Sequence, residues 1–271
     1  MALGVEKNNY SNGQLYWDET SEEYQEITRI STNDFHYGPL LPGDSLVKAL
    51  PEIKSGMRCL ELGAGAGQNS IYLASKGANC LVTDISSEQL KHGEKIASEK
   101  KLKLDFQVLS LDDLEPSGMG EWDLIHSTWA FPFAEDQKAL IAKCAKMLKS
   151  GGVLHVTTGH PVFAGEWIQL DDFEEGMFVS DYFNPPREVR FTKDEECFIR
   201  TRQHPISKYI NWIIESGLTL TKVLELEPVD LPSMNESEFE DACPYDSDVW
   251  REMYPQIQRV PFVVTYQAVK K

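Results

Sequence analysis

The feature that most constrains the fold is a glycine-rich turn that follows a short apolar segment. Residues 58–62 read Arg-Cys-Leu-Glu-Leu, and Gly63, Gly65 and Gly67 follow at alternate positions. An apolar run of this length before a turn is typical of a central strand in a parallel sheet. Glycines let the chain turn tightly and let a ligand approach the backbone without meeting a Cβ atom. A helix is expected to begin near Gln68, directly after the turn.

An aspartate at the end of the next apolar segment completes the pattern. Asp84 ends the run Asn-Cys-Leu-Val-Thr-Asp, seventeen residues beyond Gly67. Together the turn and the acid predict a nucleotide-like cofactor bound between two strand ends. The alternative is a glycine-rich turn of another α/β protein in which Asp84 only caps the helix that follows. The combination of Glu61, the glycines and Asp84 at this distance favours the cofactor site.

The spacing of the glycines separates this turn from two common phosphate-binding loops. A dinucleotide fingerprint, Gly-x-Gly-x-x-Gly, requires glycine at position 68, where this chain has Gln68. A P-loop requires lysine followed by serine or threonine after the turn, and the chain has neither pair there. The turn is therefore expected to hold a different nucleoside-containing ligand.

With Glu61 before Gly-x-Gly-x-Gly, the segment resembles motif I of the class I S-adenosylmethionine-dependent methyltransferases. The strand-like run at 122–127, a helix over 135–148, and Leu-Lys-Ser-Gly-Gly-Val-Leu at 148–154 resemble later motifs of that family. The resemblance covers about residues 55–158. It implies S-adenosyl-L-methionine as cofactor, with the turn facing its amino-acid part and Asp84 accepting hydrogen bonds from both ribose hydroxyls.

The resemblance also implies a wider set of cofactor-binding residues. Ser110 stands where many members have an acid beside adenine, so Asp112 and the backbone of Leu111 are the alternatives for that contact. Ser127 and Thr128 correspond to residues beneath the methionine part. The expected set comprises Tyr16, Tyr37, Glu61, Gly63, Gly65, Gly67, Asp84, Ile85, Ser110, Leu111, Asp112, Ser127 and Thr128.

The alternation of strand and helix patterns after the turn predicts a doubly wound α/β fold. The family resemblance implies a seven-stranded, mostly parallel sheet in the order 3-2-1-4-5-7-6, with strand 7 antiparallel. Residues 1–50, rich in aromatic residues, are expected to form an N-terminal helical cap, and residues 51–271 the cofactor-binding domain. Residues 159–210 show short alternating segments, which predict an antiparallel lid inserted after strand 5.

Candidate catalytic and acceptor-binding residues lie near the expected strand ends and in the lid. His160 directly follows strand 5, where an imidazole could remove a proton from a hydroxyl or amine. A structural histidine bonded to a loop carbonyl is the equally weighted alternative. His36 is a candidate contact to the acceptor or the cofactor, and His204 either lines the acceptor pocket or caps a helix. The expected acceptor-binding residues are His36, Trp129, Trp167, Tyr182 and His204.

Composition limits the partners that this chain is expected to have. The formal net charge is −17, from 43 acidic and 26 basic residues. A protein this acidic does not attract phosphate backbones or anionic lipid, so nucleic acid and membranes are not expected partners. The five cysteines never occur as Cys-x-x-Cys, so neither a disulfide framework nor a metal site is expected. No signal peptide or bilayer-spanning segment is recognisable, and a cytoplasmic monomer or homodimer is expected.

These observations lead to one main functional hypothesis and one alternative. The main hypothesis is a methyltransferase that moves a methyl group from S-adenosylmethionine to an O or N nucleophile of a small molecule. The alternative is a protein on the same fold that binds S-adenosylmethionine without transferring methyl, such as a cyclase, an isomerase or a non-catalytic binding protein.

Overall fold

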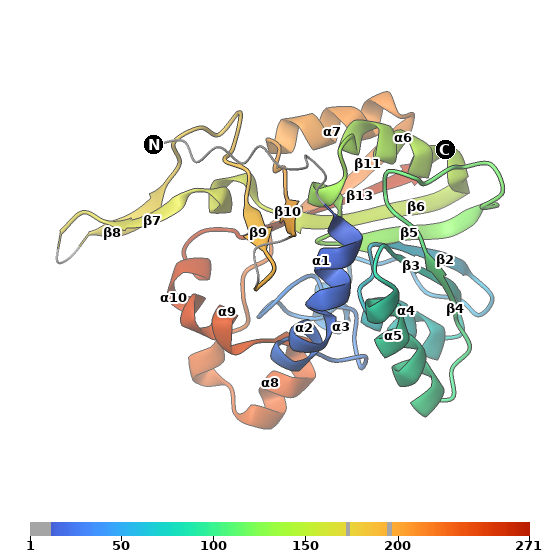
Figure 1. Cartoon of the computed structure of the whole chain (residues 1–271), viewed down its shortest axis with the longest axis horizontal. Coiled ribbons are helices and arrows are strands. Elements are labelled where there is room, and N and C mark those ends of the chain that lie inside the picture. The colour runs from blue at the N-terminus through green and yellow to red at the C-terminus, as the bar shows by residue number, and fades with distance from the viewer. Residues whose placement is uncertain (1–11, 172–173, 194–196) are drawn as a thin grey trace.

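A seven-stranded sheet forms the centre of the computed structural model, which describes residues 12–171, 174–193 and 197–271 (Figure 1). Its strand order is β11-β13-β6-β5-β2-β3-β4. The strands are β2 (Arg58–Leu62), β3 (Asn79–Asp84), β4 (Asp105–Val108), β5 (Trp122–Thr128), β6 (Leu148–Gly159), β11 (Leu218–Leu224) and β13 (Val263–Lys270). Strand β13 runs antiparallel to both of its neighbours, and the other pairs are parallel. The predicted fold class and strand order are confirmed.

Burial along the strands explains which of them are central. In β2 and β5 nearly every residue is buried, including Leu60, Leu62 and Ile125, which are fully enclosed. Strands covered on both faces need such continuous apolar runs. Edge strand β11 instead alternates between buried or half-buried and exposed positions, as expected for a strand with one covered face.

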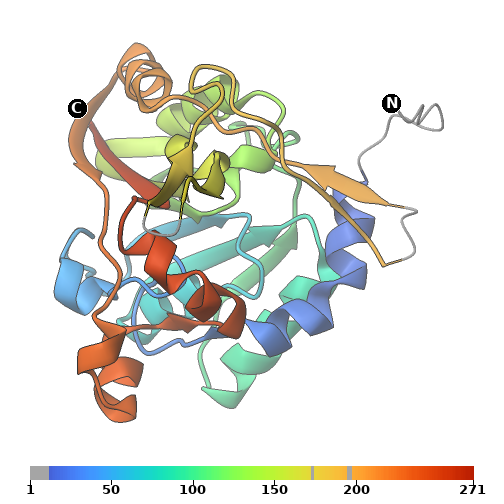
Figure 2. The same ribbon diagram turned by 90° about the vertical axis from the view of Figure 1, so that its left-hand side faces the viewer.

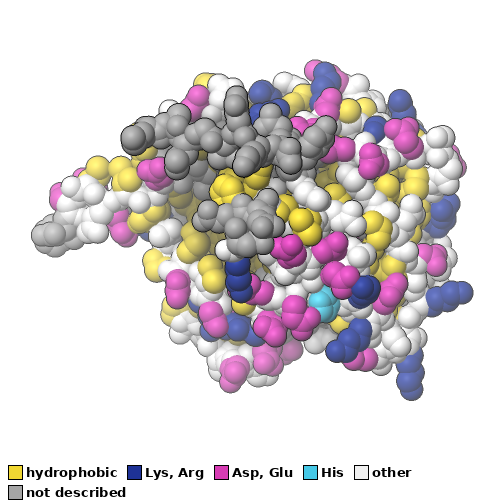
Figure 3. Space-filling model, viewed as in Figure 1, with side chains coloured by type: hydrophobic (Ala, Val, Ile, Leu, Met, Phe, Trp, Pro, Cys, Tyr) yellow, Lys and Arg dark blue, Asp and Glu magenta, His cyan; other side chains and the backbone are white. Residues whose placement is uncertain are grey.

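Helices cover both faces of the sheet (Figures 1 and 2). Helices α4 (Gln68–Ser75) and α5 (Ser87–Glu99) pack on β2, β3 and β4, and helices α6 (Gln137–Met147) and α7 (Ile206–Glu215) pack on the opposite face. The Ser86 side chain accepts a hydrogen bond from the Gln89 N–H at 3.1 Å and thereby caps α5. Acidic side chains are scattered over the face shown in Figure 3, with hydrophobic side chains exposed near its middle. No helix in the described ranges has the length and hydropathy of a bilayer span.

The N-terminal segment packs against a segment that lies between β11 and β13. The first contains α1 (Gly13–Glu19), α2 (Ser21–Ile27), β1 (Arg29–Ile30) and α3 (Asp44–Val47), while residues 1–11 of the expected cap lie outside the described part. The second contains η3 (Leu231–Ser233), α8 (Glu236–Ala242), β12 (Tyr245–Asp246), α9 (Asp248–Glu252) and α10 (Tyr254–Ile257). Strand β1 pairs antiparallel with β12, and Arg29 donates hydrogen bonds to Asp246 and Asp248.

The insertion after β6 forms two antiparallel hairpins. A 3-10 turn, η2 (Pro161–Ala164), precedes the first hairpin, β7 (Glu166–Gln169) and β8 (Glu175–Phe178), which projects from the rest of the molecule (Figure 1). The second hairpin, β9 (Val189–Phe191) and β10 (Phe198–Arg200), lies beside α1. There Tyr16, Cys197 and Ile199 share an apolar cluster with Phe133 of η1 (Phe131–Phe133). The predicted antiparallel insertion is confirmed.

Helix α5 contacts the glycine-rich turn through Gly93. A Cβ atom at this position would lie 2.5 Å from the Ala66 carbonyl oxygen and 2.8 Å from Cε1 of Phe106. Glycine here lets the helix approach the backbone of the turn more closely than any other residue allows.

Replacement of Gly93 with alanine is therefore expected to lower the free energy of unfolding by about 1–3 kcal/mol, the usual cost of overpacking. In an ordinary helix interior the same change is stabilising by about 1 kcal/mol. Urea unfolding measures the effect, with Ser98→Ala at an exposed position of the same helix as control. A Gly93→Ala protein as stable as the wild type would contradict this close approach.

Candidate functional site

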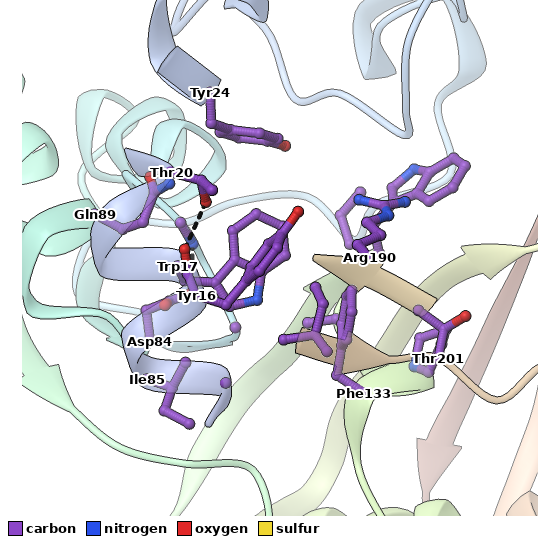
Figure 4. A pocket seen from close by; sticks show the side chains of 18 of the residues that line it. Tyr16, Trp17, Thr20, Tyr24, Asp84, Ile85, Gln89, Phe133, Arg190 and Thr201 are labelled. Carbon is purple, nitrogen blue, oxygen red and sulfur yellow. Dashed lines mark hydrogen bonds between the residues drawn. The ribbon is translucent and has the colours of Figure 1, made fainter. Parts of the chain in front are cut away.

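The carboxyl ends of β2, β3, β4 and β5 open into a cavity of about 720 Å³ (Figure 4). Its floor is the glycine-rich turn with the residues that follow these strands, and its other walls come from α1, α2, β9, β10 and the segment around α9. Small-molecule sites have volumes of about 300–1,000 Å³ and occur at such strand ends in open α/β sheets.

The glycine-rich turn has a backbone that favours glycine at all three positions. Gly63, Gly65 and Gly67 have φ values of 64°, 57° and 69°. A Cβ atom on Gly63 would collide with Ala130, and one on Gly67 would lie 2.7 Å from Val82. Gly63 and Gly65 line the cavity, so their backbones are accessible to a ligand.

Asp84, the last residue of β3, is bonded to the turn. Its Oδ2 accepts a hydrogen bond from the Gly65 N–H at 2.8 Å, and its Oδ1 accepts one from the Ser86 N–H at 2.9 Å. Burial raises the pKa of Asp84 to about 6, although these backbone donors act in the opposite direction. Each carboxylate oxygen keeps a further acceptor position, so the group can accept two hydroxyl donors from the cavity side.

Glu61 fixes the start of α4. Its Oε2 accepts a hydrogen bond from the Ser70 N–H at 3.1 Å, in the first turn of the helix. Its side chain is buried, and burial raises its pKa to about 8. Glu61 lines the cavity as well, and therefore connects β2, the glycine-rich turn and α4 at one point.

The residue that follows β5 has a strained backbone. Trp129 has a φ of 68°, which is rare for residues other than glycine, and its indole Nε1 donates to the Tyr37 carbonyl oxygen at 3.2 Å. Its N–H donates to the Thr157 carbonyl oxygen at 2.8 Å. These bonds hold the Trp129 ring at the cavity wall next to Thr128.

The structure brings most of the predicted cofactor residues, and two predicted acceptor residues, to this one cavity. These residues come from α1, the loop after β1, and the ends of β2, β3, β4 and β5. They are Tyr16, His36, Glu61, Gly63, Gly65, Asp84, Ile85, Ser110, Leu111, Asp112, Thr128 and Trp129.

Three predicted cofactor residues lie behind the cavity wall. The Ser127 hydroxyl donates to the Leu62 carbonyl oxygen at 2.7 Å, and Gly67 packs against β3. The Tyr37 ring is fully buried, and its hydroxyl donates to Asp44. Each of them supports residues that line the cavity and does not itself line it.

The predicted catalytic residue His160 does not line the cavity either. Its Nε2 lies 2.9 Å from Oε1 of Glu225, and its Nδ1 accepts a hydrogen bond from the Val162 N–H at 3.2 Å. This second contact caps the turn η2. The placement corresponds to the structural alternative, with a backbone N–H as partner in place of a carbonyl.

Three of the predicted acceptor-binding residues belong to the insertion, and their side chains make contacts away from the cavity. The Trp167 Nε1 donates to Glu175 at 3.1 Å within the projecting hairpin, and Tyr182 packs edge-on against Phe183. His204 packs edge-on against Trp212, with 4.9 Å between ring centroids. None of the three lines the cavity.

Sequence reasoning missed the residues that form the walls away from the glycine-rich turn. They share no motif, and they come from α1, α2, η1, the second hairpin and the segment before β13. The most prominent are Trp17, Tyr24, Phe133, Arg190, Tyr245 and Trp250. The aromatic enrichment of the first 50 residues indicated two of them, Trp17 and Tyr24. No local sequence pattern indicates Arg190 or Tyr245.

The central part of the chain is similar to known proteins. Residues 60–156 match the family model described as a methyltransferase domain. A ubiquinone biosynthesis O-methyltransferase of Xanthomonas oryzae pv. oryzae is 31% identical over 104 residues. This match covers 38% of the present chain and 44% of the relative, so the chain spans less than half the length of the curated relatives it matches.

Solved structures share the fold over most of the chain. A putative S-adenosylmethionine-dependent methyltransferase from Listeria monocytogenes superposes with a TM-score of 0.65 at 21% identity, covering 84% of this chain and 95% of that one. The cyclase SpnF has a TM-score of 0.60 at 12% identity, covering 96% of this chain and 95% of that one. Residues 60–156 of this chain are thus similar to a methyltransferase domain, and its fold is shared with S-adenosylmethionine-dependent methyltransferases of known structure.

Proposed function

We propose that this protein transfers the methyl group of S-adenosylmethionine to an O or N nucleophile of a small molecule. The observation that carries the proposal is the position of Asp84, which is bonded to Gly65 and faces a cavity large enough for both a cofactor and an acceptor. S-Adenosylmethionine, when bound, supplies a sulfonium methyl group that an adjacent nucleophile can accept. The chain's own task is then to position the two molecules and to exclude water.

The residues on the floor of the cavity suit the parts of this cofactor. Asp84 would accept hydrogen bonds from the ribose hydroxyls, and the backbones of Gly63 and Gly65 would lie against the amino-acid part. Ile85 and Leu111 offer apolar surface for the adenine ring. The Asp112 Oδ1 accepts a hydrogen bond from the Glu135 N–H at 3.0 Å. Its Oδ2 would remain to accept a hydrogen bond from adenine.

His36 is the histidine that we propose to contact the acceptor. It lines the cavity, and Asn69 holds its backbone: Asn69 Oδ1 accepts from the His36 N–H at 2.8 Å. Its Nδ1 is buried and has no hydrogen-bond partner among the described residues, so Nε2 is the ring nitrogen left to meet a ligand. Burial lowers the pKa of His36 to about 3, so the imidazole is neutral near pH 7 and can accept a hydrogen bond from a hydroxyl or amine.

The class of acceptor that we propose is based on the net charge of the chain and on the name of its curated relative. A net charge of −17 disfavours nucleic acid, and the curated relative is named as an O-methyltransferase, which supports a small molecule with an oxygen nucleophile. A cytoplasmic location, a monomeric or homodimeric state, and the roles of residues 1–50 as cap and 159–210 as lid are part of the same proposal.

One solved structure supports a second candidate function. The cyclase SpnF shares the fold over nearly the whole chain, so a protein of this shape can use the cavity for a reaction other than methyl transfer. An assay with a panel of phenols, carboxylic acids and amines separates methyl transfer from this alternative. Formation of S-adenosylhomocysteine in that assay would support methyl transfer. Conversion of a compound without that product would favour the cyclase-like alternative.

Asp84→Ala is expected to weaken S-adenosylhomocysteine binding by about 1.5–3 kcal/mol, because hydrogen bonds to a charged group are lost. Isothermal titration calorimetry measures the change. Asp105→Ala, at an exposed aspartate that begins the neighbouring strand β4, is the matched control and should bind like the wild type. Equal affinities of the two variants would refute the ribose-binding role of Asp84.

The affinity is also expected to depend on pH. Binding of ribose hydroxyls favours the ionised form of Asp84, whose pKa in the free protein is raised to about 6. Affinity for S-adenosylhomocysteine should therefore be full above this pH and fall as the pH is lowered through it, by up to roughly tenfold one unit below. Titrations between about pH 5 and 8 test this expectation, and Asp84→Asn should remove the dependence. A wild-type affinity that is constant over this range would contradict it.

A further inference from the structure

Arg190 brings a positive charge into the cavity of an acidic protein. It lies on β9, and Figure 4 shows it with Thr201 across the cavity from Asp84 and Ile85. It is therefore on the side that faces away from the expected ribose site. A cation at this place attracts negatively charged groups of a molecule that occupies the acceptor part of the cavity.

Only one edge of the guanidinium is engaged by the described residues. The Arg190 Nε donates to Oε1 of Glu188 at 2.7 Å, and neither terminal nitrogen donates to a described residue. Both side chains of this pair are about half exposed, at 40% and 52%, so the pair contributes little to stability. It does orient the side chain, and it leaves two parallel N–H groups for a ligand. This fork fits a carboxylate in bidentate geometry.

Three phenol groups surround the same charge. Burial raises the pKa of Tyr16, Tyr24 and Tyr245, and the Arg190 charge acts in the opposite direction on each, so all three rings lie within its electrostatic range. Near neutral pH their hydroxyls are protonated; the Tyr245 hydroxyl donates to Tyr24, which leaves the hydroxyls of Tyr16 and Tyr24 to donate to a ligand. The nearby acid Glu23 is already paired with Lys193 at 2.9 Å. A cluster of N–H and O–H donors in this arrangement suits an oxyanion.

The remaining walls are aromatic. The Trp17 ring makes edge contacts with Tyr24 and Phe133, with 5.6 Å and 5.7 Å between centroids. Trp129 and Trp250, 5.8 Å apart, also line the cavity. Walls of this kind favour a flat aromatic ligand through stacked or edge contacts.

We propose that the acceptor is a small aromatic carboxylic acid whose carboxylate is bound by the free edge of Arg190. The inference rests on the proposed function, and it adds the chemical class of the acceptor. The aromatic body would lie among Trp17, Phe133 and Trp250, with its nucleophile toward Thr128 and His36. A carboxylate could also belong to the methionine part of the cofactor, so the experiment separates the two sources.

The test compares acids with their neutral amides. Benzoate, cinnamate and indole-3-acetate, with the three matching amides, are titrated calorimetrically into the protein with and without saturating S-adenosylhomocysteine. At least one acid should bind about tenfold or more tightly than its amide, as for a charged hydrogen-bonded pair. Arg190→Met should abolish this preference and Arg190→Lys should retain part of it. Arg187→Met, at an exposed position three residues earlier, should retain all of it.

Three outcomes decide against the proposal. It is overturned if no acid binds more tightly than its amide, or if Arg190→Met keeps the preference. It is also overturned if Arg190→Met weakens S-adenosylhomocysteine but not 5′-methylthioadenosine, because the bound carboxylate is then the cofactor's own. Failure of the wild type to bind S-adenosylhomocysteine refutes the proposed function instead, and the titrations without it still decide the role of Arg190.

Discussion

The hydrogen bond between the Gly65 N–H and the Asp84 carboxylate is the contact on which the site depends. It joins the turn after β2 to the end of β3 at 2.8 Å, and it needs the left-handed backbone that Gly65 adopts. Through it, a buried carboxylate is held at the cavity wall with acceptor capacity to spare. The rest of the sheet serves to bring these two strand ends together, since every residue of β2 pairs with a residue of β3.

A second constraint comes from the segments that enclose the cavity. Residues before β2 and residues between β11 and β13 are far apart in the sequence, yet β1 pairs with β12 and Arg29 bonds to Asp246 and Asp248. The hairpin β9–β10 closes the remaining side through its contacts with α1. Floor and walls therefore have different origins. The floor lies within residues 60–156, which match the methyltransferase family model, and the walls, apart from Trp129 and Phe133, are built from parts of the chain outside that match.

This division explains what could be predicted from the sequence. The strand segments and the placement of Asp84 at a strand end follow from local patterns, because apolar runs and turns are encoded within a few residues, whereas the strand order was implied by the family resemblance. His160 was predicted in the site from its position after a strand, but long-range packing gave it Glu225 as partner. Arg190 and Tyr245 could not be found, since only the tertiary fold brings β9 and β12 to the same cavity.

The central claim is that an adenosyl cofactor binds between the ends of β2 and β3. A crystal structure of the protein grown with S-adenosylhomocysteine tests it most directly. Both ribose hydroxyls are expected within hydrogen-bond distance of the Asp84 carboxylate, and the amino-acid part is expected against Gly63 and Gly65. Electron density for the ligand at any other place in the fold would contradict it.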